Sequence, residues 1–178
     1  MNIITAGNKI NNLMIIGVLV VLLLALFFQV VLNELPCPLC LLQRVGFTGI
    51  ILGFLLNLRF GLRSSHYAIS IISAVFTSVV ALRQISLHVV PGTGSYGGSI
   101  LGLHLYSWSF LLSILIIVVT AIMSGIDGQY QERMKHLILI PANTWVRVLF
   151  FIIMLLLLAN IVFTYMECGL YPCPYNPK

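Results

Sequence analysis

Residues 12–32 read NLMIIGVLVVLLLALFFQVVL, and this apolar run decides the fold class. A helix needs about 20 mainly apolar residues to cross the hydrocarbon core of a bilayer. A cleaved signal peptide has a shorter apolar region, of about 7–15 residues, followed by small residues at the cleavage site. The run here is longer and is followed by the polar segment Asn33-Glu34-Leu35-Pro36. We therefore expect a retained membrane-spanning helix.

The composition of the whole chain has the same character. The chain of 178 residues is 60% hydrophobic and only 7% charged, whereas a soluble domain carries about 25% charged residues. Lipid must therefore cover much of the surface, and a backbone in lipid must form helices or a closed barrel. The apolar runs are continuous rather than alternating, which favours helices. The net charge of +5 comes from scattered residues without a basic stripe, so we expect no nucleic-acid partner.

Four further runs are long and apolar enough to span a membrane. The sequence therefore predicts a single all-α integral membrane domain over residues 1–178: a four-helix transmembrane bundle plus a fifth transmembrane helix. The expected spans are residues 12–32, 41–58, 68–90, 108–124 and 145–165.

The distribution of basic residues predicts the topology. Cytoplasmic segments of membrane proteins are enriched in Lys and Arg. A cytoplasmic N-terminus places six of the nine basic residues inside: Lys9, Arg59, Arg63, Arg133, Lys135 and Arg147. The C-terminus is then periplasmic, and residues 33–40, 91–107 and 166–178 form the outer segments. All four cysteines fall in these outer segments, where disulfides persist.

The strongest chemical signal is Cys37-Pro-Leu-Cys40, at the start of the second expected span. Pro38 suits the first turn of a helix. A thiol at a helix N-terminus lies near exposed N–H groups and the positive end of the helix dipole, which favour the reactive thiolate. The alternatives are a structural bridge, which would gain little from so short a loop, or half of a zinc site completed by the other two cysteines.

Polar residues within the expected spans are candidates for cofactor binding. Arg44 lies one helical turn after Cys40 on the same face, where it would stabilise a Cys40 thiolate, bind a quinone carbonyl, or extend to the lipid headgroups. Arg83, Gln84 and His88 form a polar stripe near the end of the third span. Such a stripe indicates either a cofactor or proton path, or hydrogen bonding between helices.

The second cysteine pair, Cys168 and Cys173, lies in the expected outer tail with two turn-forming residues, Gly169 and Pro172, between its members. One interpretation is a structural disulfide that fixes the tail. The other is a second redox pair that relays a disulfide to the first pair, helped by the high effective concentration of a tethered segment.

Three segments together resemble a known family. Cys37-Pro-Leu-Cys40 is followed by Leu-Leu-Gln-Arg44, Arg83-Gln-Ile-Ser-Leu-His88 ends the third span, and Leu101-Gly-Leu103 leads toward Trp108. In these segments the chain resembles the disulfide bond formation protein B (DsbB) family, which are quinone-dependent thiol oxidases of the bacterial inner membrane. The resemblance covers about residues 14–124, which include the first four spans.

The resemblance implies a bacterial inner-membrane enzyme with ubiquinone or menaquinone as electron acceptor. It implies a DsbA-like electron donor, a periplasmic thioredoxin-fold dithiol protein. Cys37 and Cys40 would exchange disulfides and reduce the quinone, with Arg44 assisting. Because Cys40 is nearer to Arg44, we expect Cys40 to react with the quinone.

The chain departs from the family pattern in one respect. Better-known members carry a second cysteine pair between the third and fourth spans, but residues 91–107 contain no cysteine. We hypothesise that Cys168 and Cys173 replace that pair, as catalytic residues. Two other functions stay open: a non-catalytic membrane scaffold with structural disulfides, and a thiolate metal-binding protein. Transport is disfavoured, because no charged residue lies at mid-span.

Overall fold

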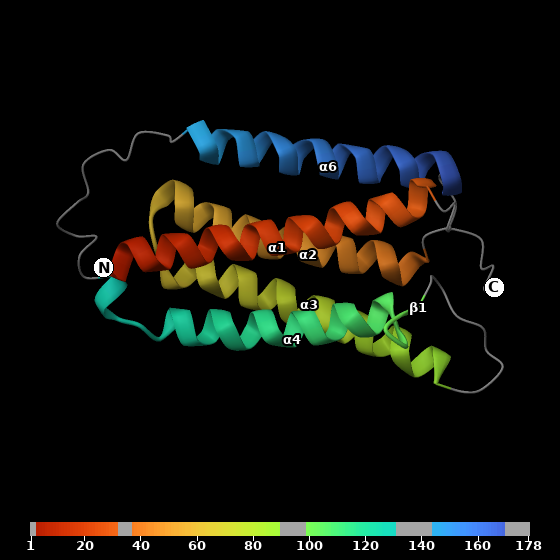
Figure 1. The fold of residues 1–178 in the computed structure, drawn as a ribbon, viewed down its shortest axis with the longest axis horizontal. Helices are drawn as coiled ribbons and strands as arrows, with labels where there is room; N and C mark the ends of the chain where they lie inside the picture. Colours follow the sequence, from red (N-terminus) through yellow and green to blue (C-terminus); the bar gives the residue numbers. More distant parts are fainter. Residues whose placement is uncertain (1–2, 32–36, 90–98, 131–143, 170–178) are drawn as a thin grey trace.

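The computed structural model describes residues 3–31, 37–89, 99–130 and 144–169, which form a bundle of long helices (Figure 1). Consecutive helices run in opposite directions, as short connections between membrane spans require. The elements are α1 (Ile3–Val31), α2 (Pro38–Phe60), α3 (Ser64–His88), β1 (Ser99–Ile100), β2 (Leu103–His104), α4 (Leu105–Ser124) and α6 (Thr144–Cys168).

The predicted fold class is confirmed. Five helices of the described chain are long and apolar enough to cross a membrane, so the protein is an all-α integral membrane protein. The helices extend beyond the expected spans: α1 begins at Ile3 rather than near residue 12, and α6 continues to Cys168 rather than ending near residue 165. The added turns include polar residues such as Asn8 and Lys9. These turns lie in the interfacial region, where water can hydrogen-bond to polar side chains while the helix continues.

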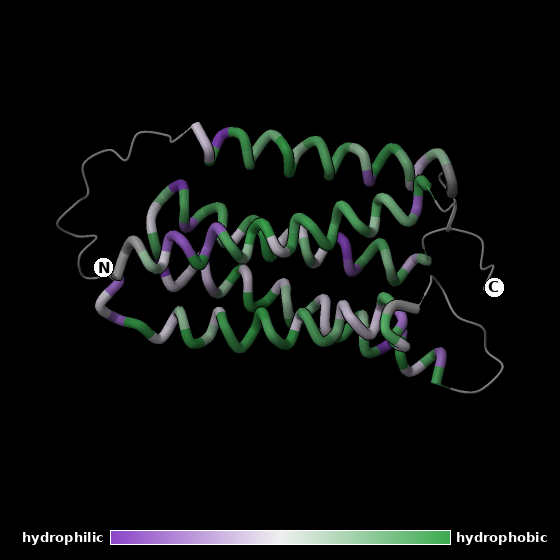
Figure 2. The backbone as a smooth tube through the Cα atoms, viewed as in Figure 1, coloured by the Kyte–Doolittle hydropathy of each residue, from purple (hydrophilic) through white to green (hydrophobic). Residues whose placement is uncertain are grey.

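The surface and the interior have the polarity of a membrane protein. Large apolar side chains are exposed along the helices, for example Leu13 at 67% and Ile72 at 69%, while Asn11, Thr77 and Gln84 are completely buried. Figure 2 shows the hydrophobic colour along the length of every helix, with much of the hydrophilic colour toward the ends of the bundle. Lipid is therefore the solvent of the outer face, and polar side chains find their partners between helices.

Helices α2 and α3 approach each other most closely through three glycines of α2, Gly46, Gly49 and Gly53. A Cβ atom added at Gly53 would lie 2.7 Å from the carbonyl oxygen of His66 and 2.8 Å from the backbone nitrogen of Ser70. Small residues at a membrane helix interface allow this close backbone approach. Among the described helices, α2 and α3 make the most extensive contact.

Helix α6 lies against α1 and α2, on the side of the bundle away from α4 (Figure 1). Leu149 and Ile153 of α6 are buried in the apolar core. The indole nitrogen of Trp145 donates a hydrogen bond of 3.1 Å to Asn12 Oδ1 of α1. The fifth helix is therefore held to the bundle by both apolar and polar contacts.

A small hairpin, which the sequence pattern did not predict, precedes α4. Strands β1 and β2 pair antiparallel through Ser99–His104 and Ile100–Leu103. Leu101 and Gly102 form the two-residue turn with φ angles of 53° and 80°, and positive φ at both positions is the geometry of a type I′ turn. The hairpin lies at the same end of the bundle as the N-terminus of α2 (Figure 1).

Candidate functional site: a disulfide at the start of α2

Cys37 and Cys40 form a disulfide at the N-terminus of α2. Cys37 is the N-cap residue and Pro38 occupies the first turn, where its missing N–H group has no helical partner to lose. The backbone N–H of Cys40 donates a hydrogen bond of 3.0 Å to Cys37 Sγ. Cys37 is only 4% exposed, whereas Cys40 is partly buried. The helix N-terminus therefore directs a backbone donor at the sulfur of Cys37.

Gln84 contacts the same sulfur atoms and is itself held by a second glutamine, Gln43. Gln43 Nε2 donates a hydrogen bond of 2.7 Å to Gln84 Oε1, which leaves the amide nitrogen of Gln84 facing the disulfide. Gln84 Nε2 lies 3.2 Å from Cys37 Sγ and 3.4 Å from Cys40 Sγ. Gln84 is completely buried. The disulfide therefore contacts an N–H donor from α3 whose orientation is set by α2.

The structure brings His88 near this pair but not Arg83. His88 Nδ1 lies 2.9 Å from the carbonyl oxygen of Gln84, and the His88 ring packs on Tyr106 with 5.5 Å between ring centres. Tyr106 in turn stacks on His104 of the hairpin. The side chain of Arg83 is exposed. Of the predicted stripe on α3, Gln84 contacts the disulfide and His88 lies one turn further on.

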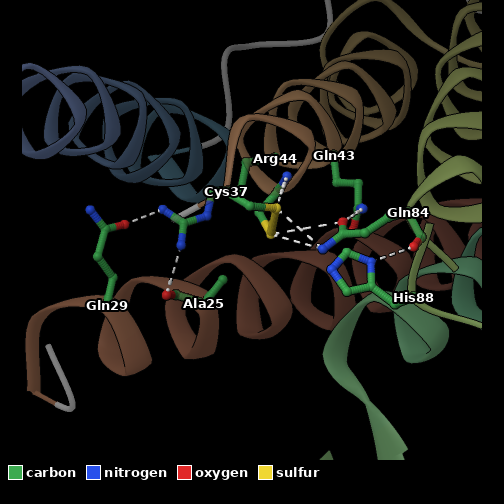
Figure 3. The surroundings of a disulfide bond; sticks show 8 residues. Ala25, Gln29, Cys37, Gln43, Arg44, Gln84 and His88 are labelled. Atoms are coloured by element: carbon green, nitrogen blue, oxygen red, sulfur yellow. Dashed lines mark hydrogen bonds between the residues drawn. A yellow bond between two sulfur atoms is a disulfide. The ribbon is translucent and has the colours of Figure 1, made fainter. Parts of the chain in front are cut away.

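Arg44 lies on the other side of the disulfide and is held by two other helices. Its guanidinium donates hydrogen bonds to Gln29 Oε1 and to the carbonyl oxygen of Ala25, both of α1, the latter at 2.9 Å. It also donates a hydrogen bond of 3.0 Å to Asn160 Oδ1 of α6. Figure 3 shows the guanidinium directed toward Gln29 and Ala25, with the glutamine pair and His88 on the opposite side of the disulfide. Arg44 therefore joins α1, α2 and α6 beside the cysteines.

An open groove of about 310 Å³ begins next to Arg44, between α2 and α6. Leu41, Val45, Leu157 and Ile161 line it together with the Arg44 side chain. Leu41 directly follows Cys40 in the chain. The site thus combines a disulfide, a fixed guanidinium and an apolar groove within about one turn of α2.

The second cysteine pair is described in part. Helix α6 ends at Cys168, at the same end of the bundle as the N-terminus of α2 (Figure 1). Gly169 follows with a φ of 62° and donates its N–H to the carbonyl oxygen of Tyr165 at 2.8 Å, which is a common way to end a helix. Cys173 and the predicted pairing of these cysteines lie outside the described residues.

The alternative of a zinc site depends on the same undescribed atoms. Within the described part of the chain, no group of three or more His, Cys, Asp or Glu side chains is placed to hold a metal ion. A site made from both cysteine pairs would need the side chains of Cys168 and Cys173, which the structure does not describe.

Three residues of this site were not predicted from the sequence: Gln29, Gln43 and Asn160. A signal for each was present. Gln43 lies three residues after Cys40, on the same helix face. Gln29 and Asn160 are single polar residues near the ends of two highly apolar runs, where an unpaired amide would be costly. That Gln29 and Asn160 share Arg44 as a partner was not predictable, because this contact depends on how α1 and α6 pack on α2.

Comparison with known proteins identifies the family of the chain. The family described as "Disulfide bond formation protein DsbB" matches residues 8–96. This region is half of the chain, and it contains most of α1, all of α2 and α3, the disulfide, Arg44 and the glutamine pair. No curated protein and no solved structure matches the chain. The disulfide at the start of a membrane helix and the family match agree, and the chain belongs to the DsbB family of membrane proteins that form disulfide bonds.

Proposed function

We propose that the protein is a quinone-dependent thiol oxidase. It reoxidises a periplasmic thioredoxin-fold dithiol protein, a DsbA-like donor, and passes the electrons to ubiquinone or menaquinone in the bacterial inner membrane. The observation that carries this proposal is the mainly apolar groove beside Arg44, whose lining begins at Leu41, the residue after Cys40 of the disulfide. The family match supports disulfide chemistry, and the groove supports a lipid-soluble electron acceptor.

The groove fits a quinone in shape and in chemistry. Its walls are mainly apolar side chains of α2 and α6, with Thr48, Thr164 and Tyr165 among them, and it is open on one side, so a ring and its isoprenoid tail can enter from the bilayer. Arg44 supplies a guanidinium, which stabilises negative charge on a carbonyl oxygen. When bound there, a quinone supplies a two-electron acceptor. Gln29 and Asn160 hold the guanidinium in place for this contact.

The reaction of the cysteines is thiol–disulfide exchange. A thiolate, either of the donor protein itself or of a tail pair that the donor has reduced, attacks one sulfur atom of the Cys37–Cys40 disulfide, and the second thiol of the attacking pair resolves the mixed disulfide. The attacking pair becomes a disulfide, and Cys37 and Cys40 hold two electrons and two protons. Transfer of the two electrons and two protons to the acceptor closes the Cys37–Cys40 disulfide again. We assign the reaction with the acceptor to Cys40, because its neighbour Leu41 and Arg44 both line the groove.

Cys37 and Gln84 have a supporting role in this scheme. The N–H of Cys40 and the amide of Gln84 both point at Cys37 Sγ. After reduction they stabilise negative charge on that sulfur, because a helix N-terminus and a buried amide are fixed dipoles in a medium of low polarity. His88 contacts the backbone of Gln84 and steadies this end of α3. Nothing in the contacts of Arg83 supports its predicted role in quinone binding.

The tail pair is proposed to relay electrons from the donor. Cys37 is almost fully buried, so a folded partner protein has poor access to it, whereas a short segment of the same chain has better access. The end of α6 at Cys168 lies at the same end of the bundle as the disulfide.

A Cys168→Ala, Cys173→Ala double variant should therefore lose most of its activity with the protein donor but keep it with a small dithiol such as dithiothreitol. Full activity with the protein donor would leave the tail pair structural.

The function itself is tested by quinone reduction in detergent, followed by ultraviolet absorbance, with a reduced thioredoxin-fold dithiol protein as donor. We expect wild-type protein to consume ubiquinone or menaquinone, and Cys37→Ser to consume neither. A Ser86→Ala variant, changed at an exposed position on α3, should retain activity. Folded wild-type protein that reduces neither quinone would instead favour a scaffold with structural disulfides, or a metal-binding protein if zinc or copper co-purifies in stoichiometric amount.

A further inference from the structure

A second groove lies between α2 and α6, at the end of the bundle opposite the disulfide. Its volume is about 390 Å³, and its walls include Leu52 and Leu56 of α2 and Phe150 and Phe151 of α6. These side chains are apolar and, at Leu52, Phe150 and Phe151, substantially exposed. The groove is therefore open to the bilayer and suited to a hydrocarbon chain.

Two arginines, one from each helix, also line this groove. Arg59 lies in the last turn of α2 and Arg147 near the start of α6. Arg59 lies over the ring of Phe60, with 5.6 Å from the guanidinium carbon to the ring centre. None of the described residues that line the groove is acidic. Two positive charges from separate helices therefore meet one apolar groove at the membrane boundary, a level also marked by Trp145.

We propose that this groove is a binding site for an anionic glycerophospholipid, with an acyl chain along the apolar walls and the phosphate between Arg59 and Arg147. Guanidinium groups form charge-assisted, bidentate hydrogen bonds with phosphate, and basic pockets between membrane helices bind anionic headgroups. A soluble anion would leave the apolar walls without a partner. A zwitterionic lipid would bring no net negative charge to the two arginines.

The position of the two arginines distinguishes a site from a general basic surface. Lys9 and Arg63 are also exposed at this end of the bundle, but neither is among the described residues that line the groove. A general attraction to an anionic bilayer would use all four charges alike. A built site depends on Arg59 and Arg147 alone.

Binding would join α6 to the rest of the bundle. Helix α6 contacts α1 and α2 through fewer residues than join α2 to α3, and the lipid would bridge α2 and α6 at the end where Trp145 and Asn12 already meet. The lipid site does not depend on the proposed quinone reaction, because it lies at the opposite end of the same helix pair.

The test is native mass spectrometry of the purified full-length protein in detergent, with phosphatidylglycerol and phosphatidylethanolamine as the added lipids. Two double variants that each remove two positive charges are compared: Arg59→Gln, Arg147→Gln in the groove, and Lys9→Gln, Arg63→Gln outside it. We expect wild type and the Lys9, Arg63 variant to bind phosphatidylglycerol alike and in preference to phosphatidylethanolamine. The Arg59, Arg147 variant should bind phosphatidylglycerol more weakly, on the order of tenfold.

Three further measurements serve as controls. Circular dichroism and gel filtration of each variant show whether it is folded, and inorganic phosphate as competitor should displace no lipid. Equal loss of phosphatidylglycerol binding in the two double variants would overturn the proposal, because surface charge alone would then account for binding. So would equal binding of both lipids by wild type, or displacement by inorganic phosphate.

Discussion

Gln84 lies within hydrogen-bonding distance of both sulfur atoms, and its side chain carries no charge. A neutral amide costs less to bury between membrane helices than an ion does. Its oxygen is occupied by Gln43, and its nitrogen faces Cys37 and Cys40. The disulfide is therefore supported by a dipole of fixed direction, which favours added electrons on sulfur.

Replacing Gln84 with Leu should slow quinone reduction about tenfold, because a hydrogen bond to a charged group is worth about 1.5–3 kcal/mol. The reduction potential of the cysteine pair should become more negative, since the reduced form loses its amide donor. The potential is measured by equilibration with glutathione, and the rate by quinone absorbance. Ser86→Ala is the matched control on the same helix. An unchanged potential in a folded Gln84→Leu variant would show that the amide is structural.

Asn160 is expected to position Arg44 rather than to touch the donor protein. In Asn160→Leu the guanidinium loses its hydrogen bond to α6, and the KM for quinone should rise about tenfold while the KM for the dithiol donor stays the same. Asn12→Leu is the control, because it removes another hydrogen bond between α6 and the bundle, the one from Trp145, far from the cysteines. Equal effects of the two substitutions would mean that Asn160 acts only by holding α6 in place.

Part of this site was predictable from the sequence because its residues are close in the chain. The spacing of Cys37, Cys40 and Arg44 on one helix follows from the helical repeat, and the structure places them as that repeat requires. The partners of Arg44 were not predictable in this way. Gln29 and Asn160 come from helices whose rotation about their own axes is set by packing, and hydropathy does not determine it.

Among the helices, the α2–α3 pair has the strongest geometric constraint. The backbone of α3 lies so near Gly53 that a methyl group at this position would overlap the carbonyl oxygen of His66. Backbone atoms of a helix cannot move aside as a flexible side chain can. The close pairing of α2 with α3 also holds Gln84 at the distance from the disulfide that its hydrogen bonds require.

Gly53→Ala should therefore destabilise the protein, by about 1–3 kcal/mol, as expected for overpacking. Gly17→Ala is the control, since a Cβ atom there meets nothing within 4 Å. This second change should be neutral or stabilising by up to about 1 kcal/mol, because alanine favours a helix over glycine. Thermal unfolding of both variants in detergent is the measurement. Equal stability of the two variants would contradict the close α2–α3 contact.

The elements themselves were predictable to different extents. Long apolar runs predict membrane helices reliably because few other structures satisfy the backbone in lipid. The β1–β2 hairpin was missed, since its strands are two residues each and Leu101 has a positive φ that a leucine rarely adopts. The pairing of two such short strands depends on the helix ends beside them. Sequence periodicity does not describe the positions of these helix ends.

On the scale of the whole molecule, the two ends of the bundle differ in chemistry. The disulfide, the hairpin and the end of α6 lie at one end, and Lys9, Arg59, Arg63 and Arg147 lie at the other. Basic residues favour the cytoplasmic side. We therefore propose that the disulfide end faces the periplasm, where an oxidised pair persists.

Cysteine labelling tests this orientation. In a variant with all four native cysteines replaced by serine, Leu101→Cys at the hairpin and Arg63→Cys between α2 and α3 are introduced one at a time. A membrane-impermeant maleimide added to whole bacterial cells with a permeable outer membrane should label the first and not the second. Both should react after the inner membrane is dissolved. Labelling of Arg63→Cys in intact cells would reverse the topology.

The hydrogen bond between Arg44 and Asn160 also has a consequence for biogenesis. A ribosome makes α2 long before α6, so Arg44 enters the bilayer before its partner on α6 exists. An arginine without that partner is costly in lipid, and the nascent bundle should stay with the insertion machinery or chaperones until α6 arrives. Formation of a working oxidation site would then coincide with the insertion of α6, so that chains without α6 do not pass electrons to the quinone pool.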